Sequence, residues 1–267
     1  MESLTYVYLQ KTKDRKRFVE KFLERKVEKF AKAERVLVKP NIVSYESYPT
    51  TTHPATLEAC LEFLSYFGKE ILVADGPAVD AGDSNKIIES HPLKSICNLY
   101  GVEFLDLSDK EMKRVKTQNF ELELSTIPFN YDFIISLPVL KSHGVCGLTG
   151  ALKNQYGFLS PKDKVVLHGK NIHLAIAELN QVIKPNLYIV DAVQTLINTN
   201  ERRHGGEPKE LGYMLGGEDP VSLDVAGFGL LKQVEPKFEG KSYEDILHLK
   251  YAIDLGVGTK NFYISNL

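Results

Sequence analysis

The sequence predicts an α/β protein with a mostly parallel sheet, helices on both faces and Rossmann-like layers. Short apolar runs rich in β-branched residues alternate with longer segments in which apolar residues recur at helical spacing. Several runs are apolar at every position, as expected of strands buried on both faces of a sheet. Neither a linker nor a repeat divides the 267 residues, so we expect a single domain over residues 1–267.

The expected elements follow in chain order. Strands are predicted where apolar runs end at polar or turn-forming residues, over residues 6–9, 36–38, 71–74, 102–105, 133–137, 187–190 and 262–264. Helices are predicted from the spacing of apolar residues over 14–30, 54–67, 84–100, 172–183, 219–232 and 243–255. Residues 107–130, where 121–124 alternate like a hairpin strand, and 197–210 are candidate insertions. Residues 144–170 are rich in glycine and polar side chains, which predicts a functional loop with a short helix.

Composition narrows the classes of protein. Lys and Arg number 33 against 35 Asp and Glu, so no whole-protein field attracts nucleic acid or an anionic membrane. No apolar run approaches the roughly 20 residues that a membrane-spanning helix needs. Cys60, Cys97 and Cys146 lie too far apart for a cluster motif, so we expect no intrinsic iron–sulfur cluster. Their sparse, odd number indicates a reducing compartment, and we expect a cytoplasmic protein without nucleic-acid or membrane partners.

Polar residues follow four of the expected strands, at the point where each strand ends. If the strands are parallel, these ends share the sheet edge at which open α/β folds bind ligands. Charged groups beside a buried sheet also need partners or a ligand to offset desolvation. A polar turn explains each of these strand ends when it is taken alone, but the four together predict a binding site. Its expected members are Lys39, Asn41, Asp75, Gly76, Lys141 and Asp191.

The segment from Lys141 to Asn154 carries glycine at every third position, at 144, 147 and 150. Glycines that lead into a helix let backbone N–H groups approach an anion, and the two lysines of the segment would add positive charge. The alternative is a flexible loop with solvated lysines. Cys146 is expected to be a packing residue. The expected anion or cofactor contacts are Gly147, Thr149, Gly150, Lys153 and Asn154.

Histidines and helix caps supply the remaining candidates. His143 follows a strand end and is the best-placed acid/base, because imidazole titrates near neutrality. Thr52 and His53 lie at a helix N-terminus, where they bind an anion or only cap the helix. Asp219 is a candidate carboxylate ligand for a divalent metal, although capping alone accounts for it. Three further histidines suggest nothing beyond exposure to solvent: His91, His204 and His248.

A set of motifs resembles the family called domain of unknown function 362. In chain order they are Val-Lys-Pro-Asn at 38–41, Ala-Asp-Gly at 74–76, Leu-Pro-Val-Leu-Lys-Ser-His at 137–143, Leu-Thr-Gly-Ala-Leu-Lys-Asn at 148–154, Lys-Pro-Asn-Leu-Tyr-Ile-Val-Asp-Ala at 184–192 and Gly-Gly-Glu-Asp-Pro-Val-Ser-Leu-Asp at 216–224. The likeness runs over residues 35–232. Many members carry ferredoxin-like cysteine repeats, which this chain lacks, so the iron–sulfur label does not transfer.

A more distant resemblance is to lactate racemase-type enzymes, which hold a nickel-pincer nucleotide. His143, Lys153 and His168 follow the order and approximate spacing of that family's motif. The resemblance implies that Lys153 is the cofactor-attached lysine, His168 the metal ligand and His143 the acid/base. Residues 149–150 stand at the family's Ser-Gly position, but residues 151–152 replace its Gly-Arg.

Together these observations predict an enzyme that binds a small anionic metabolite or a phosphorylated cofactor. His143 would transfer protons, and Lys39, Lys141 and Lys153 would hold the anion or cofactor. The reaction would be racemase- or isomerase-like or oxidoreductase-associated, with a divalent metal or a nucleotide-type cofactor as the candidate. The alternatives are a non-catalytic cofactor- or metal-binding module and a redox subunit that uses an externally supplied cluster. Substrate and oligomeric state stay open.

Overall fold

The computed structural model describes residues 4–267, which form twelve strands and ten α-helices. The strands are β1 (Tyr6–Lys11), β2 (Arg35–Pro40), β3 (Glu70–Asp75), β4 (Glu103–Asp106), β5 (Met112–Lys116), β6 (Glu121–Ser125), β7 (Phe133–Leu137), β8 (Lys141–His143), β9 (Gly147–Thr149), β10 (Leu187–Ile197), β11 (Glu207–Gly217) and β12 (Tyr263–Ser265). The helices are α1 (Arg15–Arg25), α2 (Val27–Phe30), α3 (Pro54–Ser65), α4 (Ser84–Ser90), α5 (Pro92–Leu99), α6 (Ala151–Asn154), α7 (Pro161–Gly169), α8 (Ile172–Val182), α9 (Pro220–Leu231) and α10 (Leu247–Asp254). None of the helices between residues 4 and 267 combines the length and apolar content that crossing a membrane requires.

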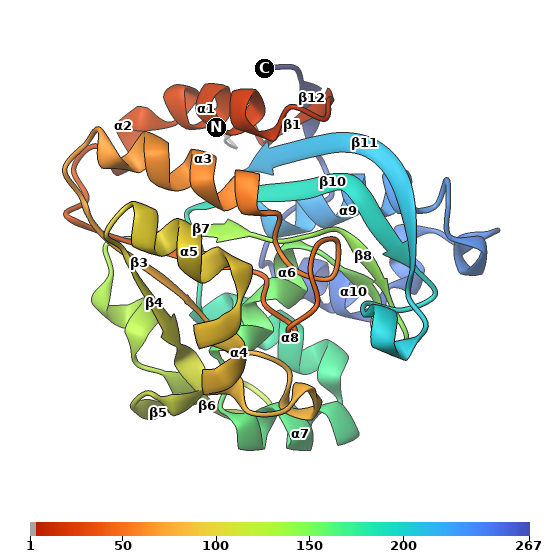
Figure 1. The fold of residues 1–267 in the computed structure, drawn as a ribbon. Helices are drawn as coiled ribbons and strands as arrows, with labels where there is room; N and C mark the ends of the chain where they lie inside the picture. The colour runs from red at the N-terminus through yellow and green to blue at the C-terminus, as the bar shows by residue number, and fades with distance from the viewer. Residues whose placement is uncertain (1–3) are drawn as a thin grey trace.

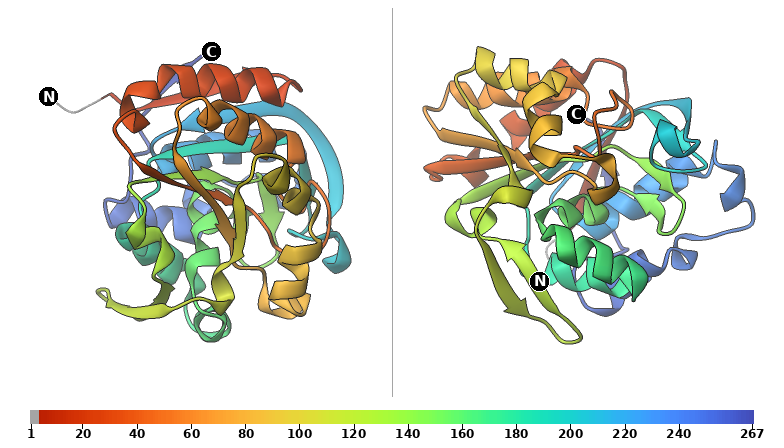
Figure 2. Two further views of the ribbon diagram at one scale, coloured as in Figure 1. Left: turned by 60° about the vertical axis from the view of Figure 1, so that its left-hand side comes forward. Right: turned by 60° about the horizontal axis from the view of Figure 1, so that its bottom comes forward.

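Eight strands form one sheet in the order β12-β1-β11-β10-β7-β2-β3-β4 (Figure 1). In this sheet β11 runs antiparallel to both of its neighbours, β1 and β10. The other neighbouring pairs, from β10 to β4 and between β1 and β12, are parallel. The predicted mostly parallel sheet is therefore confirmed. The strand predicted over 121–124 is also confirmed, since it forms the separate hairpin β5-β6, which projects from the lower part of the molecule (Figures 1 and 2).

Helices cover both faces of the sheet, as the sequence predicts. α1 and α3 lie on one face, where Phe18 of α1 and Leu61 of α3 belong to one apolar core (Figure 1). α8, α9 and α10 contribute to a second core on the other face. Along β10, Ile189 packs in the first core and Tyr188 and Val190 in the second, because successive side chains of a strand point to opposite faces.

Three of the predicted helices are divided in the structure. The helix predicted over 84–100 is two helices, α4 and α5, with extended backbone at His91 between them (φ −68°, ψ 139°). Pro92 follows, and a proline disfavours helical backbone at the residue before it. The Nδ1 atom of His91 instead accepts a hydrogen bond from Leu93 N at 3.2 Å and caps α5. The helices predicted over 14–30 and 243–255 are likewise broken, at Lys26 and Ile246.

The strand predicted over 187–190 does not end at Asp191, so that part of the prediction is wrong. β10 continues to Ile197 because it stays paired with β11, which begins within the candidate insertion 197–210. Asp191 is 0% exposed, and its carboxylate accepts hydrogen bonds from Arg15 Nε at 2.6 Å and Tyr48 OH at 2.8 Å. A carboxylate can lie within a buried strand here because these donors replace water.

Replacing Asp191 is expected to destabilise the fold. Asp191→Ala leaves the guanidinium of Arg15, whose side chain is 11% exposed, without its carboxylate. Removing one partner of a buried ion pair typically lowers the free energy of unfolding by about 3 kcal/mol, which urea denaturation measures. Asp254→Ala, at an exposed position of α10, is the control and should change the free energy of unfolding by less than about 0.5 kcal/mol. Similar values for the two variants would contradict a structural role for Asp191.

Candidate functional site

A cavity of about 600 Å³ lies at the carboxyl end of the parallel strands. The residues after β2 and β3, the β8-β9 hairpin, α6, α7 and the segment after β10 form its wall. Asn41 comes directly after β2, and Asp75 is the last residue of β3. Because β2 and β3 are parallel neighbours, both residues reach one edge of the sheet, which is the edge predicted to hold a ligand.

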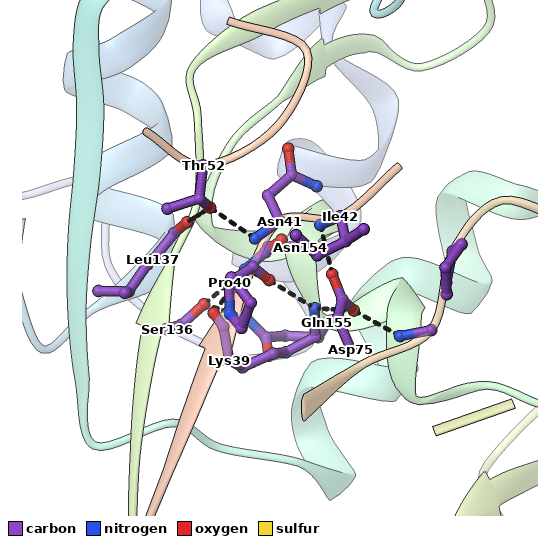
Figure 3. Close-up of polar contacts among 12 residues, drawn as sticks. Lys39, Pro40, Asn41, Ile42, Thr52, Asp75, Ser136, Leu137, Asn154 and Gln155 are labelled. Atoms are coloured by element: carbon purple, nitrogen blue, oxygen red, sulfur yellow. Dashed lines mark hydrogen bonds and ion pairs between the residues drawn. The ribbon is translucent and has the colours of Figure 1, made fainter. Parts of the chain in front are cut away.

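A buried ion pair joins Lys39 to Asp75, which lines the cavity (Figure 3). Lys39 Nζ donates to Asp75 Oδ1 at 2.6 Å, and the other carboxylate oxygen accepts from Ile42 N at 2.6 Å. The side chains of Lys39 and Asp75 are 1% and 3% exposed. Gly157 packs directly on the pair, since a Cβ atom there would lie 2.1 Å from Asp75 Oδ1. Burial lowers the pKa of Lys39, and the Asp75 carboxylate opposes that shift.

Hydrogen bonds fix Asn41 above this pair. Asn41 N donates to Thr52 Oγ1, and that hydroxyl donates to Leu137 O, each at 2.7 Å (Figure 3). Lys141 Nζ donates to Asn41 Oδ1 at 2.9 Å and to the carbonyl oxygen of Thr50. Lys141 is fully buried, and burial lowers its pKa to about 7. Lys141 is not among the lining residues, and it contacts the cavity wall by holding Asn41.

Lys153 lies on the cavity wall in the short helix α6. The backbone N–H groups of residues 151–152 donate to the buried carboxylate of Asp224 at 2.6 and 3.0 Å. The close approach requires Gly150, where a Cβ atom would lie 2.2 Å from Asp224 Oδ1. Lys153 Nζ lies 5.3 Å from the ring centroid of Tyr156 and forms no ion pair with a described carboxylate. Burial lowers the pKa of Lys153.

The structure adds Lys164 of α7, which the sequence interpretation missed. Lys164 Nζ donates to Gly76 O and Pro77 O, each at 3.0 Å, and burial lowers its pKa to about 8. The one signal in the sequence is its spacing, because Lys164 precedes His168 by one helical turn and both line the cavity.

Basic side chains outnumber carboxylates around the cavity. In the described part of the chain, Lys141, Lys153 and Lys164 have no carboxylate within ion-pair distance. The carboxylates that line the cavity are already paired: Asp75 with Lys39, and Asp80 and Glu201 with Arg203. The chain carries a formal charge of −2, so this is a local excess and not a property of the whole protein.

His143 is held in one tautomer. Its Nδ1 atom accepts hydrogen bonds from Val145 N and Cys146 N, both at 3.1 Å. An Nδ1 that accepts from two amides carries no proton, so the neutral ring carries its proton on Nε2. Burial, then the nearby positive charge of Lys153, lowers the pKa of His143 well below its ordinary value. As placed, the neutral ring of His143 offers an Nε2–H donor, and accepting a proton at Nδ1 would require it to give up both amide bonds.

Other polar groups also face the cavity. His168 lines it, with its ring centroid 6.4 Å from that of His143, and burial and Lys153 lower the pKa of His168. Thr149 Oγ1 and Asn154 Oδ1 are buried and have no hydrogen-bond partner among residues 4–267. Buried polar atoms are nearly always paired, so these two oxygens are available to a ligand or to water.

A second charged cluster lies at the rim, formed by Asp80, Glu201, Arg203 and His204. The carboxylates and the imidazole bring ligand atoms within 4.8 Å of one another, as a cation site would. Arg203 already supplies the positive charge, since its guanidinium contacts Glu201 at 2.7 Å and Asp80 at 3.0 Å. The cluster is therefore an ion-pair network that links the segment after β3 to the segment after β10. The sequence interpretation gave Glu201 and His204 no role, because nothing in the polar segment 197–210 distinguishes them.

The predicted site residues divide into three groups by position. Those that line the cavity are Asn41, Asp75, Gly76, His143, Thr149, Lys153, Asn154 and His168. Those that contact lining residues from outside the cavity are Lys39, Thr52 and Lys141. Those that lie elsewhere in local structure are His53 and Asp219, which cap α3 and α9, Gly147 and Gly150 in the β8-β9-α6 segment, and Asp191 in β10. His91 and His248, expected to be exposed, are 4% and 0% exposed.

Comparison with known proteins confirms both resemblances. The family described as domain of unknown function (DUF362) matches residues 36–229. A thylakoid-associated protein of Synechocystis sp. is 25% identical over 211 residues, or 76% of this chain and 64% of that protein, so the chain spans less than two thirds of that relative. The lactate racemase apoprotein from Thermoanaerobacterium thermosaccharolyticum matches with a TM-score of 0.60 and 10% identity over 88% of this chain and 58% of that one. This likeness shows a shared fold.

Lys141 should make stability depend on pH. Burial lowers its pKa from 10.5 to about 7, so between these values the unfolded chain binds more protons than the folded chain. The free energy of unfolding therefore rises with pH in this window, by up to about 1.4 kcal/mol per pH unit from this group. Lys141→Met should remove this contribution to the pH dependence of the free energy of unfolding, as measured by denaturation at pH 7, 8, 9 and 10. Lys162→Met, at an exposed position of α7, should keep the wild-type slope, and an unchanged slope in Lys141→Met would refute the assignment.

His143 should remain neutral and protonated on Nε2 across the neutral range. Nitrogen-15 chemical shifts of labelled imidazoles distinguish the two tautomers and the imidazolium ion. We expect His143 to show the Nε2–H pattern from pH 8 down to pH 5, because the two amide donors at Nδ1 and burial oppose protonation. A ring that titrates between pH 6 and 7, or that shows Nδ1–H, would contradict the observed hydrogen bonds.

Proposed function

The chain belongs to the family called domain of unknown function 362, and we propose that it is an enzyme that binds a small anionic metabolite or the phosphate of a cofactor in this cavity. The observation that carries the proposal is the group of three amines, Lys141, Lys153 and Lys164, that have no carboxylate partner in the described chain. Burying amines without counter-charges is costly, and an anion in the cavity offsets that cost.

Lys153 is the amine proposed to contact the anion. It lines the cavity, and its Nζ atom makes no ion pair with the described carboxylates, whereas the other two amines donate to protein carbonyl or amide oxygens. Lys141 and Lys164 would then act by raising the electrostatic potential. Binding an anion would stabilise their charged forms, so protons would be taken up on binding near pH 7 to 8.

The remaining polar groups are proposed to orient the ligand and move a proton. His143 would donate from Nε2 to a ligand oxygen, and Asn154 Oδ1 would accept from a ligand hydroxyl or amine. His168 lines the same cavity and would be the proton acceptor. These roles agree with the tautomer of His143, which carries its proton on Nε2 and can donate it in a hydrogen bond.

A second candidate is a racemase-like protein that carries a nucleotide-type cofactor with a metal. Its support is the shared fold together with the gathering of His143, Lys153 and His168 on one cavity. Lys153 fits attachment to a cofactor because its amine lacks an ion-pair partner and burial lowers its pKa, which favours the nucleophilic neutral form. His168 would bind the metal, and the cofactor would supply the metal centre for the reaction.

Lys153→Gln should weaken anion binding at least about tenfold, because it removes the one amine proposed to contact the ligand. Isothermal titration of the full chain with inorganic phosphate and with short carboxylates measures the effect. Lys162→Gln is the matched control, since Lys162 lies on α7 at an exposed position outside the cavity. Equal affinities in the two variants would rule out Lys153 as the anion ligand.

Solvent exchange separates an enzyme from a binding module. Incubating the protein with carboxylates in deuterium oxide and following loss of carbon-bound protons by NMR detects proton transfer whatever the product is. We expect exchange for an accepted substrate in Lys162→Gln and none in His168→Asn. Tight binding without exchange or any other turnover would favour the non-catalytic alternative.

A further inference from the structure

Three valines surround the open side of the cavity. Val79, Val145 and Val165 all line it, yet they are 44%, 51% and 58% exposed. They come from separate parts of the chain: the 3-10 helix after β3, the turn between β8 and β9, and α7. Single exposed apolar residues are common on protein surfaces and need no explanation. Three exposed valines from three segments that line one cavity offer apolar contacts to a ligand bound there.

Beside the charged rim cluster, part of the cavity reverses the usual arrangement of polarity. Lys141 and Lys164, 0% and 6% exposed, lie with Asn154 among the buried residues around the cavity, while the valines are at its solvent side. Proteins usually bury apolar groups and expose amines, because a buried charge without a counter-charge is costly. A ligand with an anionic group at its inner end and an apolar body at its outer end would offset both the burial of the amines and the exposure of the valines.

We propose that the anion bound here carries an apolar body and that this body lies against Val79, Val145 and Val165. This inference rests on the proposed anion-binding function and names the class of ligand: a carboxylate or phosphate ester with a hydrocarbon portion. The size of the cavity agrees with it, since about 600 Å³ falls within the range of roughly 300–1,000 Å³ that holds ligands larger than a bare inorganic ion. Lys153 holds the anionic group, and the valines select for the hydrocarbon.

The test is a series of n-alkyl carboxylates and n-alkyl phosphates with two to eight carbons, titrated calorimetrically into the full chain. Each methylene that reaches the rim should strengthen binding about threefold, because it leaves water for an apolar surface. In the double variant Val145→Ser/Val165→Ser the gain should fall below about 1.5-fold per methylene. The control is Val166→Ser, which changes the next residue of α7, is 38% exposed and lies outside the cavity lining, and should keep the wild-type gain.

The outcomes separate this inference from the function on which it rests. Anions that bind with the same affinity at every chain length overturn the apolar body and leave the anion site intact. A chain-length gain that survives in the double variant also overturns it, because the hydrocarbon then binds elsewhere. Failure of every anion to bind the wild-type chain removes the proposed function itself. Whether carboxylates or phosphates bind more tightly identifies the anionic group.

Discussion

The buried ion pair between Lys39 and Asp75 is the contact on which the site depends. Asp75 accepts hydrogen bonds from Lys39 at the end of β2, from Ile42 N after β2 and from Gly76 N after β3. One carboxylate therefore joins two strand ends and the loop that follows each. Buried pairs add little net stability, but removing one partner is costly, so the pair fixes geometry more than it strengthens the fold. Asn41 and Gly76 line the cavity because this carboxylate holds both loops in place.

The loop after β2 carries that geometry to the other half of the cavity. Thr52 Oγ1 accepts a hydrogen bond from Asn41 N at the start of the loop and donates one to Leu137 O at the end of β7. Thr50 O accepts a hydrogen bond from Lys141 at the start of β8. Further along, the Glu46 carboxylate accepts from Arg202 N and Arg203 N, which positions the rim network after β10. Residues 41–53 thus contact the segment after β3, the start of β8 and the segment after β10, although few of them line the cavity.

Much of the fold could be predicted from the sequence, because its signals are local. A buried parallel strand needs an unbroken apolar run, and β2, β3 and β7 each have one. Breaks between helices were harder to predict. At His91 the break depends on the proline that follows and on the hydrogen bond by which His91 caps α5. The prediction that the strand ends at Asp191 was wrong because a carboxylate within a strand is costly unless hydrogen-bond donors reach it. Its donor Arg15 lies 176 residues away in sequence, so no local pattern shows it. Lys164 was missed for the same reason, because its partners Gly76 and Pro77 are distant in sequence. Glu201 pairs with the nearby Arg203, but no local pattern in the sequence shows that this pair reaches a cavity.

The motif from Leu148 to Asn154 and the motif that ends at Asp224 are one unit in space. Asp224 is buried and pairs with no cation in the described chain, and its carboxylate accepts from the N–H groups that begin α6. Burial raises the pKa of Asp224 to about 7, and the hydrogen bonds from these two amides oppose that shift. Glycine at 150 is required because any side chain would displace the carboxylate. The start of α6, and with it the position of Lys153 in the cavity, is therefore held by a residue more than seventy positions later in the chain.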